Sequence, residues 1–95
     1  MTYRNRPFLD LLRKIECQAC EADDGTIVAC HVNHWLKGTG HKPSDAAAFA
    51  GCYRCHCRYD QGKDMNKDER RSFATHALAK SYVTLMERGF LVVKK

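Results

Sequence analysis

The stretch GCYRCHCRYDQGK, residues 51–63, places three cysteines, a histidine and an aspartate within nine consecutive positions. Its first two cysteines, Cys52 and Cys55, are separated by two residues, and an earlier pair with the same spacing stands at Cys17 and Cys20. A Cys-x-x-Cys turn can bring both sulfurs onto one tetrahedral Zn²⁺ at about 2.3 Å. The two pairs together therefore predict one structural zinc with four cysteine ligands.

The distance between the two pairs indicates the fold class. Thirty-one residues separate Cys20 from Cys52, which is more than a simple four-cysteine finger uses and leaves room for a β-hairpin and a loop. We therefore expect a small α+β domain of the treble-clef type, with a knuckle, a hairpin and a helix around the zinc. A chain of 95 residues has a thin core that a metal cross-link helps to stabilise, so residues 1–95 are expected to form one domain.

Two disulfides or a redox-active thiol pair are the alternatives for the same cysteines. Against them, the first sixteen residues have no uninterrupted apolar core, because Asp10 and Arg13 break the apolar run, and no small-residue cleavage site follows. No apolar run approaches the roughly 18 residues of a membrane span. We expect a cytoplasmic protein without a membrane partner, and a reducing compartment favours metal ligation over disulfides.

The spacing of apolar residues predicts the secondary structure. The order is a short helix after Pro7, a strand over 26–32, a loop over 33–45, a stretch of helical character over 46–61, and a long helix from Asn66 to Gly89. Asn66 and Glu69 form a capping-box pattern at the start of the long helix. The apolar positions expected on its buried face are Phe73, Ala77, Leu78, Tyr82, Leu85 and Met86.

A second metal site is suggested by the residues that follow the second cysteine pair. His56 and Asp60 are four positions apart, so on a helix they share one face and offer nitrogen and oxygen ligands for Mg²⁺, Mn²⁺ or Zn²⁺. A solvated surface His–Asp pair is the alternative. His31 favours the metal site over the solvated pair. It projects from a strand of the hairpin, and the zinc would hold this hairpin against the same helix. A strand histidine, a helix histidine and a helix carboxylate are typical of a phosphodiester-cleaving site.

The order of these features resembles a known family. ACHVNHWLKGTGHKPSDAAAFAGCYRCHCRYDQ, residues 29–61, is similar to the YbcO-like small nucleases of phages and prophages, in the HNH (ββα-metal) superfamily. Their pattern is a strand with "AH", a loop "GTG-x-KP-x-D" and a helix starting "C-x-x-CH-x-x-x-D". The positions that match are His31, Gly38, Gly40, Lys42, Pro43, Asp45, Cys52, Cys55, His56 and Asp60.

The resemblance implies a metal-dependent DNA endonuclease with one catalytic ion beside the structural zinc. It makes His31 the general base for water, and it makes His56 and Asp60 the ligands of the catalytic ion. Asp45 is either a further ligand or a residue that orients another. The implied partners are DNA and a phage or host recombination protein, in the cytoplasm of the host cell. A non-catalytic zinc module that binds nucleic acid or a protein is the alternative function.

The charge of the chain agrees with a polyanionic partner. The formal net charge is +5 and the isoelectric point is about 9.0. Between His31 and Arg58 the only acid is Asp45, against four basic residues. Within this basic region, the residues expected to contact DNA phosphates are Lys42, Arg54 and Arg58.

Overall fold

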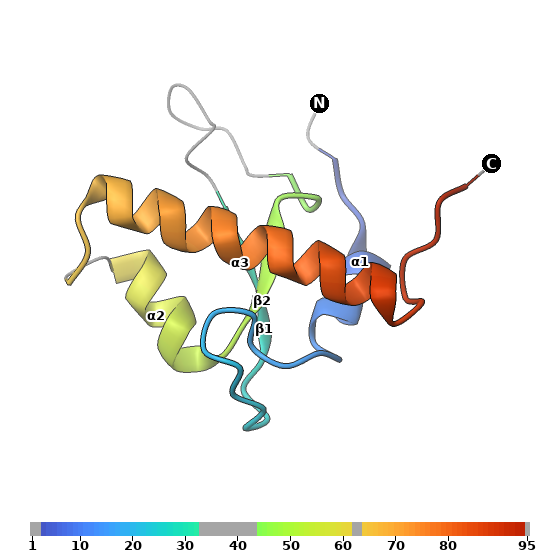
Figure 1. Cartoon of the computed structure of the whole chain (residues 1–95), viewed down its shortest axis with the longest axis horizontal. Coiled ribbons are helices and arrows are strands. Elements are labelled where there is room, and N and C mark those ends of the chain that lie inside the picture. Colours follow the sequence, from blue (N-terminus) through green and yellow to red (C-terminus); the bar gives the residue numbers. More distant parts are fainter. Residues whose placement is uncertain (1–2, 33–43, 62–63, 95) are drawn as a thin grey trace.

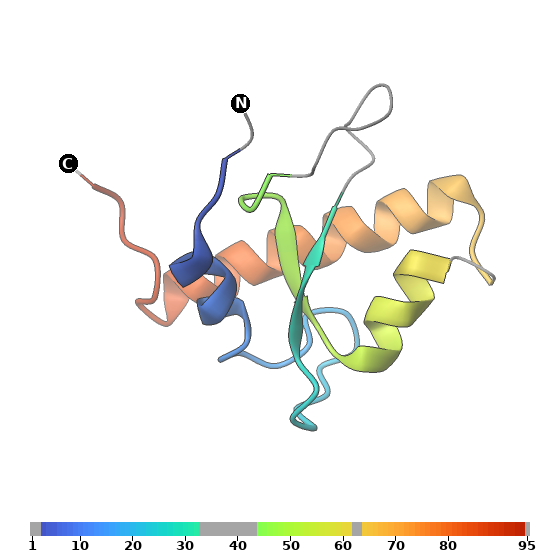
Figure 2. The same cartoon turned by 180° about the vertical axis from the view of Figure 1, so that it is seen from behind.

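The computed structural model describes residues 3–32, 44–61 and 64–94. Within them the elements are α1 (Arg6–Leu12), β1 (Val28–His31), β2 (Ala48–Gly51), α2 (Tyr53–Gln61) and α3 (Lys67–Glu87). The two strands form one antiparallel hairpin at the centre, α1 and α2 lie on either side of it, and α3 runs along the whole molecule (Figures 1 and 2). The described part is therefore a small α+β fold, as the sequence predicts.

The register of the hairpin separates its two faces. Ala29 pairs with Ala50 and His31 pairs with Ala48, so these residues share one face, and Ala48 and Ala50 belong to the cluster that contains α1 residues. Cys30 pairs with Phe49 on the other face, which packs against Tyr59 of α2 and Ala77 of α3. His31 therefore lies on the face of the hairpin toward α1.

The second strand differs from the sequence expectation. Residues 46–51 have the alanine content of a helix, but Ala48–Gly51 form β2, and all four of these residues are buried. Alanine favours a helix only weakly, by a few tenths of a kcal/mol per residue against most other residues. Pairing with β1 and burial between helices outweigh that preference. The expected hairpin is present, and its second strand lies in the segment that was expected to be helical.

The two shorter helices are close to the predicted positions. α1 begins after Asn5, whose side chain accepts a hydrogen bond from the N–H of Phe8, and Pro7 lies in its first turn. α2 starts directly after Cys52 and ends at Gln61, so Cys55 falls within its first turn. The second cysteine pair thus opens a helix, as expected.

α3 begins with the predicted capping box, in which Asn66 and Glu69 exchange hydrogen bonds between side chain and backbone. Its buried face differs from the expectation: Met86 is 50% exposed, whereas Ala74 and Ser81, which were not expected there, are fully buried. The Ser81 hydroxyl accepts a hydrogen bond from the N–H of Ala50 at 3.1 Å and donates one to the carbonyl of Ala77 at 2.8 Å. Through Ser81, α3 therefore forms a hydrogen bond to the edge of β2 that faces away from β1.

A membrane-spanning helix is not found in the residues described above, because none of their helices is both long and apolar enough to cross a bilayer.

Candidate functional site

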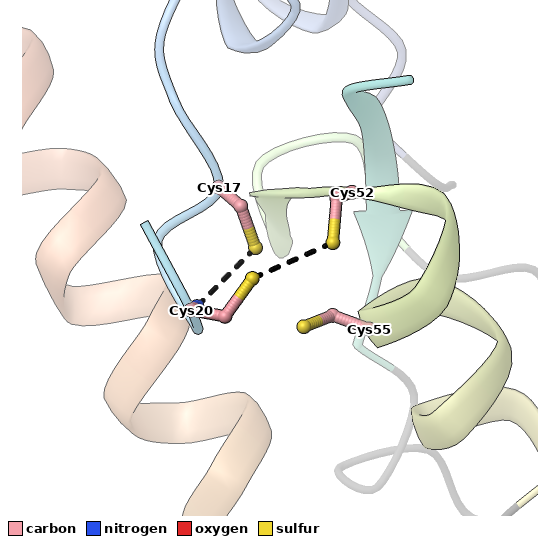
Figure 3. Close-up of side chains that lie close together, drawn as sticks. All are labelled: Cys17, Cys20, Cys52 and Cys55. Carbon is pink, nitrogen blue, oxygen red and sulfur yellow. Dashed lines mark hydrogen bonds between the residues drawn. The ribbon is translucent and has the colours of Figure 1, made fainter. Parts of the chain in front are cut away.

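The four predicted zinc ligands converge on one centre. Cys17 and Cys20 come from the loop after α1, and Cys52 and Cys55 come from the start of α2 (Figure 3). Their sulfur atoms all lie within 4.8 Å of one another, and the Cys20 and Cys52 sulfurs are 3.6 Å apart. Tetrahedral zinc with Zn–S bonds of about 2.3 Å requires sulfurs about 3.8 Å apart. The cluster therefore fits a single tetrahedral metal ion.

The cysteines of this chain are all free thiols. The 3.6 Å between the Cys20 and Cys52 sulfurs is far longer than the roughly 2.05 Å of a disulfide bond. The remaining two, Cys30 and Cys57, lie outside the four-cysteine group. Cys30 is buried, and this burial raises the pKa of its thiol to about 12, so it stays protonated at neutral pH.

The first cysteine pair has the local geometry of a metal-binding knuckle. The N–H groups of Ala19 and Cys20 both point at the Cys17 sulfur, at 3.4 Å each, and the chain then turns through Glu21, which has a φ of 67°. The Cys17 N–H closes the turn on the carbonyl of Ala22 at 2.8 Å. This turn holds Cys17 and Cys20 so that both sulfurs can reach one metal ion.

The acidity of the cysteines depends on their surroundings. A hydrogen bond from the backbone of Ala22 lowers the pKa of Cys20 to about 7. Burial raises the pKa of Cys52 and of Cys55 above the ordinary value. Two buried thiols of this kind become thiolates when a divalent cation offsets their charge, since a metal-coordinated thiol is deprotonated. The donor set therefore suits zinc.

The knuckle is also bonded to the rest of the fold. The N–H of Gln18 donates to the carbonyl of Ala50 in β2 at 2.8 Å, and the hydroxyl of Thr84 in α3 donates to the Gln18 side chain at 3.0 Å. Arg88 forms an ion pair with Glu16 at 2.6 Å, and this hydrogen bond lowers the pKa of the Glu16 carboxyl to about 2. These contacts join the knuckle to the hairpin and to α3, and the cysteine cluster joins it to the start of α2.

The first of two histidine–carboxylate pairs joins β1 to the segment before β2. The Nε2 atom of His31 lies 3.0 Å from Oδ1 of Asp45, which is buried. The same carboxylate accepts the N–H of Asn5 at 2.7 Å and Nη1 of Arg4 at 3.0 Å. These partners, the Asn5 N–H foremost, hold the pKa of Asp45 down at about 2. When a neutral His31 donates its Nε2 proton to Asp45, its Nδ1 atom is left as an acceptor.

The second pair lies on α2, where Nε2 of His56 is 3.0 Å from Oδ2 of Asp60. Adjacent ligands of an octahedral ion at about 2.1 Å are about 3.0 Å apart, so this distance suits a shared divalent ion as well as a hydrogen bond. Nδ1 of His56 is buried and has no hydrogen-bond partner in the described part of the chain. The pair lines a cavity of about 300 Å³ between α2 and β1, to which Val28 and Ala29 contribute.

The two pairs are not gathered into one ligand cluster. Across residues 3–32, 44–61 and 64–94, the four cysteines are the one group of three or more ligand residues that meets the spacing for a metal ion. His31 and Asp45 belong to the hairpin, and His56 and Asp60 belong to α2. Within the described residues, His31 is therefore not brought together with His56 and Asp60 as ligands of one ion. Both oxygens of Asp45 already accept hydrogen bonds, which is the arrangement of an orienting residue.

The predicted DNA contacts are dispersed. Arg54 and Arg58 are each two residues from His56, so on α2 they point to the side away from the His56–Asp60 pair. Nε of Arg58 also donates to Asp64 at 3.0 Å, and its guanidinium lies over a phenylalanine ring. Lys42 lies outside the described residues, as do the loop histidines His34 and His41.

Two residues that contact this region, Arg4 and Asn5, were not predicted from the sequence. Both reach Asp45 across about forty positions of sequence. No local pattern marks such a contact, because it depends on where the N-terminal segment runs in the folded chain.

Comparisons with known proteins give one informative match. No family model matches the sequence, and no curated protein matches it. A solved structure of a protein ascribed to a bacteriophage, from Escherichia coli K-12, superposes with a TM-score of 0.64. The two sequences are 23% identical, and the match covers 85% of this chain and 98% of that chain. At this identity the match shows a shared fold.

Proposed function

We propose that this chain is a metal-dependent DNA endonuclease of the HNH (ββα-metal) type, of phage or prophage origin. The observation that carries the proposal is the His31–Asp45 pair. His31 has a partly exposed side chain, and its Nε2 is held by a buried carboxylate that stays ionised because its pKa is lowered to about 2. This is the arrangement of an oriented general base. The resemblance to phage nucleases and the shared fold with a protein ascribed to a phage add support.

In this proposal the two histidine–carboxylate pairs act on one phosphate. Nδ1 of His31 takes the proton of a water molecule as its oxygen attacks the phosphorus, and the bond from phosphorus to the 3′-oxygen breaks. Asp45 stabilises the imidazolium that forms. His56 and Asp60 would hold a divalent ion, and such an ion would supply positive charge to stabilise the transition state. The departing oxygen takes its proton from solvent.

The four-cysteine site has a different role in this proposal. All four tetrahedral positions would be taken by protein ligands, so no position is left for water or substrate, and such a site is structural. It holds the knuckle against the start of α2, and α2 carries His56 and Asp60. Cys17, Cys20, Cys52 and Cys55 would hold a zinc ion that keeps α2 in place and takes no part in the chemistry.

A second candidate is a zinc module that binds nucleic acid or a protein without catalysis. One observation favours it: His31 and the His56–Asp60 pair do not form one ligand cluster. A binding module would need only the stable fold and a basic surface.

A plasmid-nicking assay separates the two functions. Zinc-loaded protein is incubated with supercoiled plasmid without added divalent ions, and then with Mg²⁺, Mn²⁺ or Zn²⁺. We expect nicked circles with at least one of these ions, and a higher ion concentration for half-maximal rate in His56→Ala. His76→Ala, on the exposed face of α3, is the matched control and should behave as wild type. DNA binding without cleavage under every ion condition would reject the nuclease and support the binding module.

A further inference from the structure

The guanidinium of Arg4 and the imidazole of His31 both contact the same oxygen atom of Asp45. Nη1 of Arg4 and Nε2 of His31 each lie 3.0 Å from Oδ1 of Asp45, so these two nitrogens are at most twice that distance, 6.0 Å, apart. The backbone fixes this arrangement. The Asn5 N–H donates to Oδ2 of Asp45 at 2.7 Å, and the Asp45 N–H donates to the carbonyl of Tyr3 at 3.0 Å.

Among residues 3–32, 44–61 and 64–94, the Arg4 guanidinium has one hydrogen-bond partner, Asp45. The Arg4 side chain is 47% exposed, whereas that of Asp45 is 6% exposed. A guanidinium carries five N–H donors in one plane, and a single Nη1 bond to Asp45 accounts for one of them. The other donors have no partner among the described residues, and we take them as the donors for a ligand beside His31. Planar, permanently charged guanidinium groups are well suited to phosphate oxygens, which they can bind through two parallel hydrogen bonds.

We propose that Arg4 binds a non-bridging oxygen of the phosphodiester that is cut, and that Asp45 holds Arg4 and His31 side by side for this purpose. The inference rests on the proposed function, because it takes His31 as the base that faces the same phosphate. Arg4 also supplies the phosphate-binding cation that α2 does not provide beside the site. Arg54 and Arg58 point away from His56, and Arg58 is already paired with Asp64. The N-terminal segment is thus part of the DNA site.

The test is the salt dependence of DNA binding, without divalent ions, so that no cleavage is needed. Binding of a fluorescein-labelled duplex is followed by anisotropy between 50 and 200 mM salt for wild type, Arg4→Gln, Arg4→Lys and Arg6→Gln. Arg6 is the matched control, since its side chain is 78% exposed and its partner is Asp10 on α1. Loss of one phosphate contact should make the slope of log K against log salt shallower by about 0.9. We expect this change in Arg4→Gln, and an unchanged slope in Arg4→Lys and Arg6→Gln.

Zinc content and thermal unfolding show whether each variant is folded. A wild-type slope in folded Arg4→Gln, or an equal change in Arg6→Gln, overturns the proposal. If Arg4→Gln does not fold, Arg4→Lys decides: a several-fold weaker affinity at an unchanged slope supports the role of the guanidinium, and wild-type affinity overturns it. Because binding is measured without cleavage, the experiment shows whether Arg4 contacts a DNA phosphate even if wild-type protein cuts no DNA. A failure of the Arg4 proposal and a failure of the nuclease proposal are therefore separate results.

Discussion

The carboxylate of Asp45 accepts hydrogen bonds from His31, Arg4 and the backbone of Asn5. Its pKa is lowered from 3.8 to about 2, so the ionised form stabilises the folded state at every pH above about 4, and this stabilisation is lost as the pH falls toward 2. At pH 7 the effect is fully present. We therefore expect Asp45→Asn to unfold at a lower temperature than wild type at pH 7, and to cleave DNA more slowly because His31 loses its ionised partner.

Asp10→Asn is the control for this variant, because Asp10 is an exposed carboxylate with one arginine partner 3.4 Å away. Thermal unfolding of both variants at pH 7, with equal zinc content, makes the comparison. Equal unfolding temperatures would show that Asp45 has no special structural role.

Individual residues of the site were predictable where local spacing defines them. The two cysteine pairs and the His56–Asp60 pair depend on turns or one helical turn, so their geometry follows from sequence spacing. The partners of Asp45 were not predictable. Arg4 and Asn5 contact Asp45 because the N-terminal segment runs beside residue 45. No sequence pattern near either residue predicts the course of this segment.

At the scale of elements, Ser81 joins α3 to β2. Its buried hydroxyl is the acceptor for the N–H of Ala50. Ser81→Ala leaves this buried N–H without a partner, which should lower the free energy of unfolding by about 1–3 kcal/mol. Urea unfolding of the zinc-loaded protein measures the effect, with exposed Ser72→Ala on the same helix as control. A loss no greater than that of Ser72→Ala would contradict the account of this contact.

Helices and strands were also predictable only where signals close in sequence define them. The capping box at Asn66 and the regular apolar spacing after it predicted α3, because both signals act within a few residues. β2 was missed, since its alanines have no strand preference of their own and the strand exists only through pairing with β1. Ser81 is buried for a similar reason: the hydroxyl is needed by a strand that is distant in sequence.

At the scale of the whole molecule, the four-cysteine cluster connects the knuckle to α2 around a thin core. We expect one zinc per chain, and unfolding when a strong chelator removes it, because structural zinc contributes on the order of 10 kcal/mol to folding. Elemental analysis and circular dichroism check this. Cys55→Ser should lose zinc and fold, whereas Cys57→Ser, outside the cluster, should keep both. Reduced, folded protein without bound metal would refute the zinc assignment.

The general-base role of His31 is tested by the single-turnover rate of DNA cleavage by His31→Ala, compared with wild type and His76→Ala at equal zinc content. We expect His31→Ala to keep its fold and zinc, because His31 is outside the cysteine cluster, and to lose a factor on the order of 10²–10⁴ in rate, the usual share of a general base. His76→Ala should retain the wild-type rate. Cleavage by His31→Ala as fast as by wild type would contradict the account.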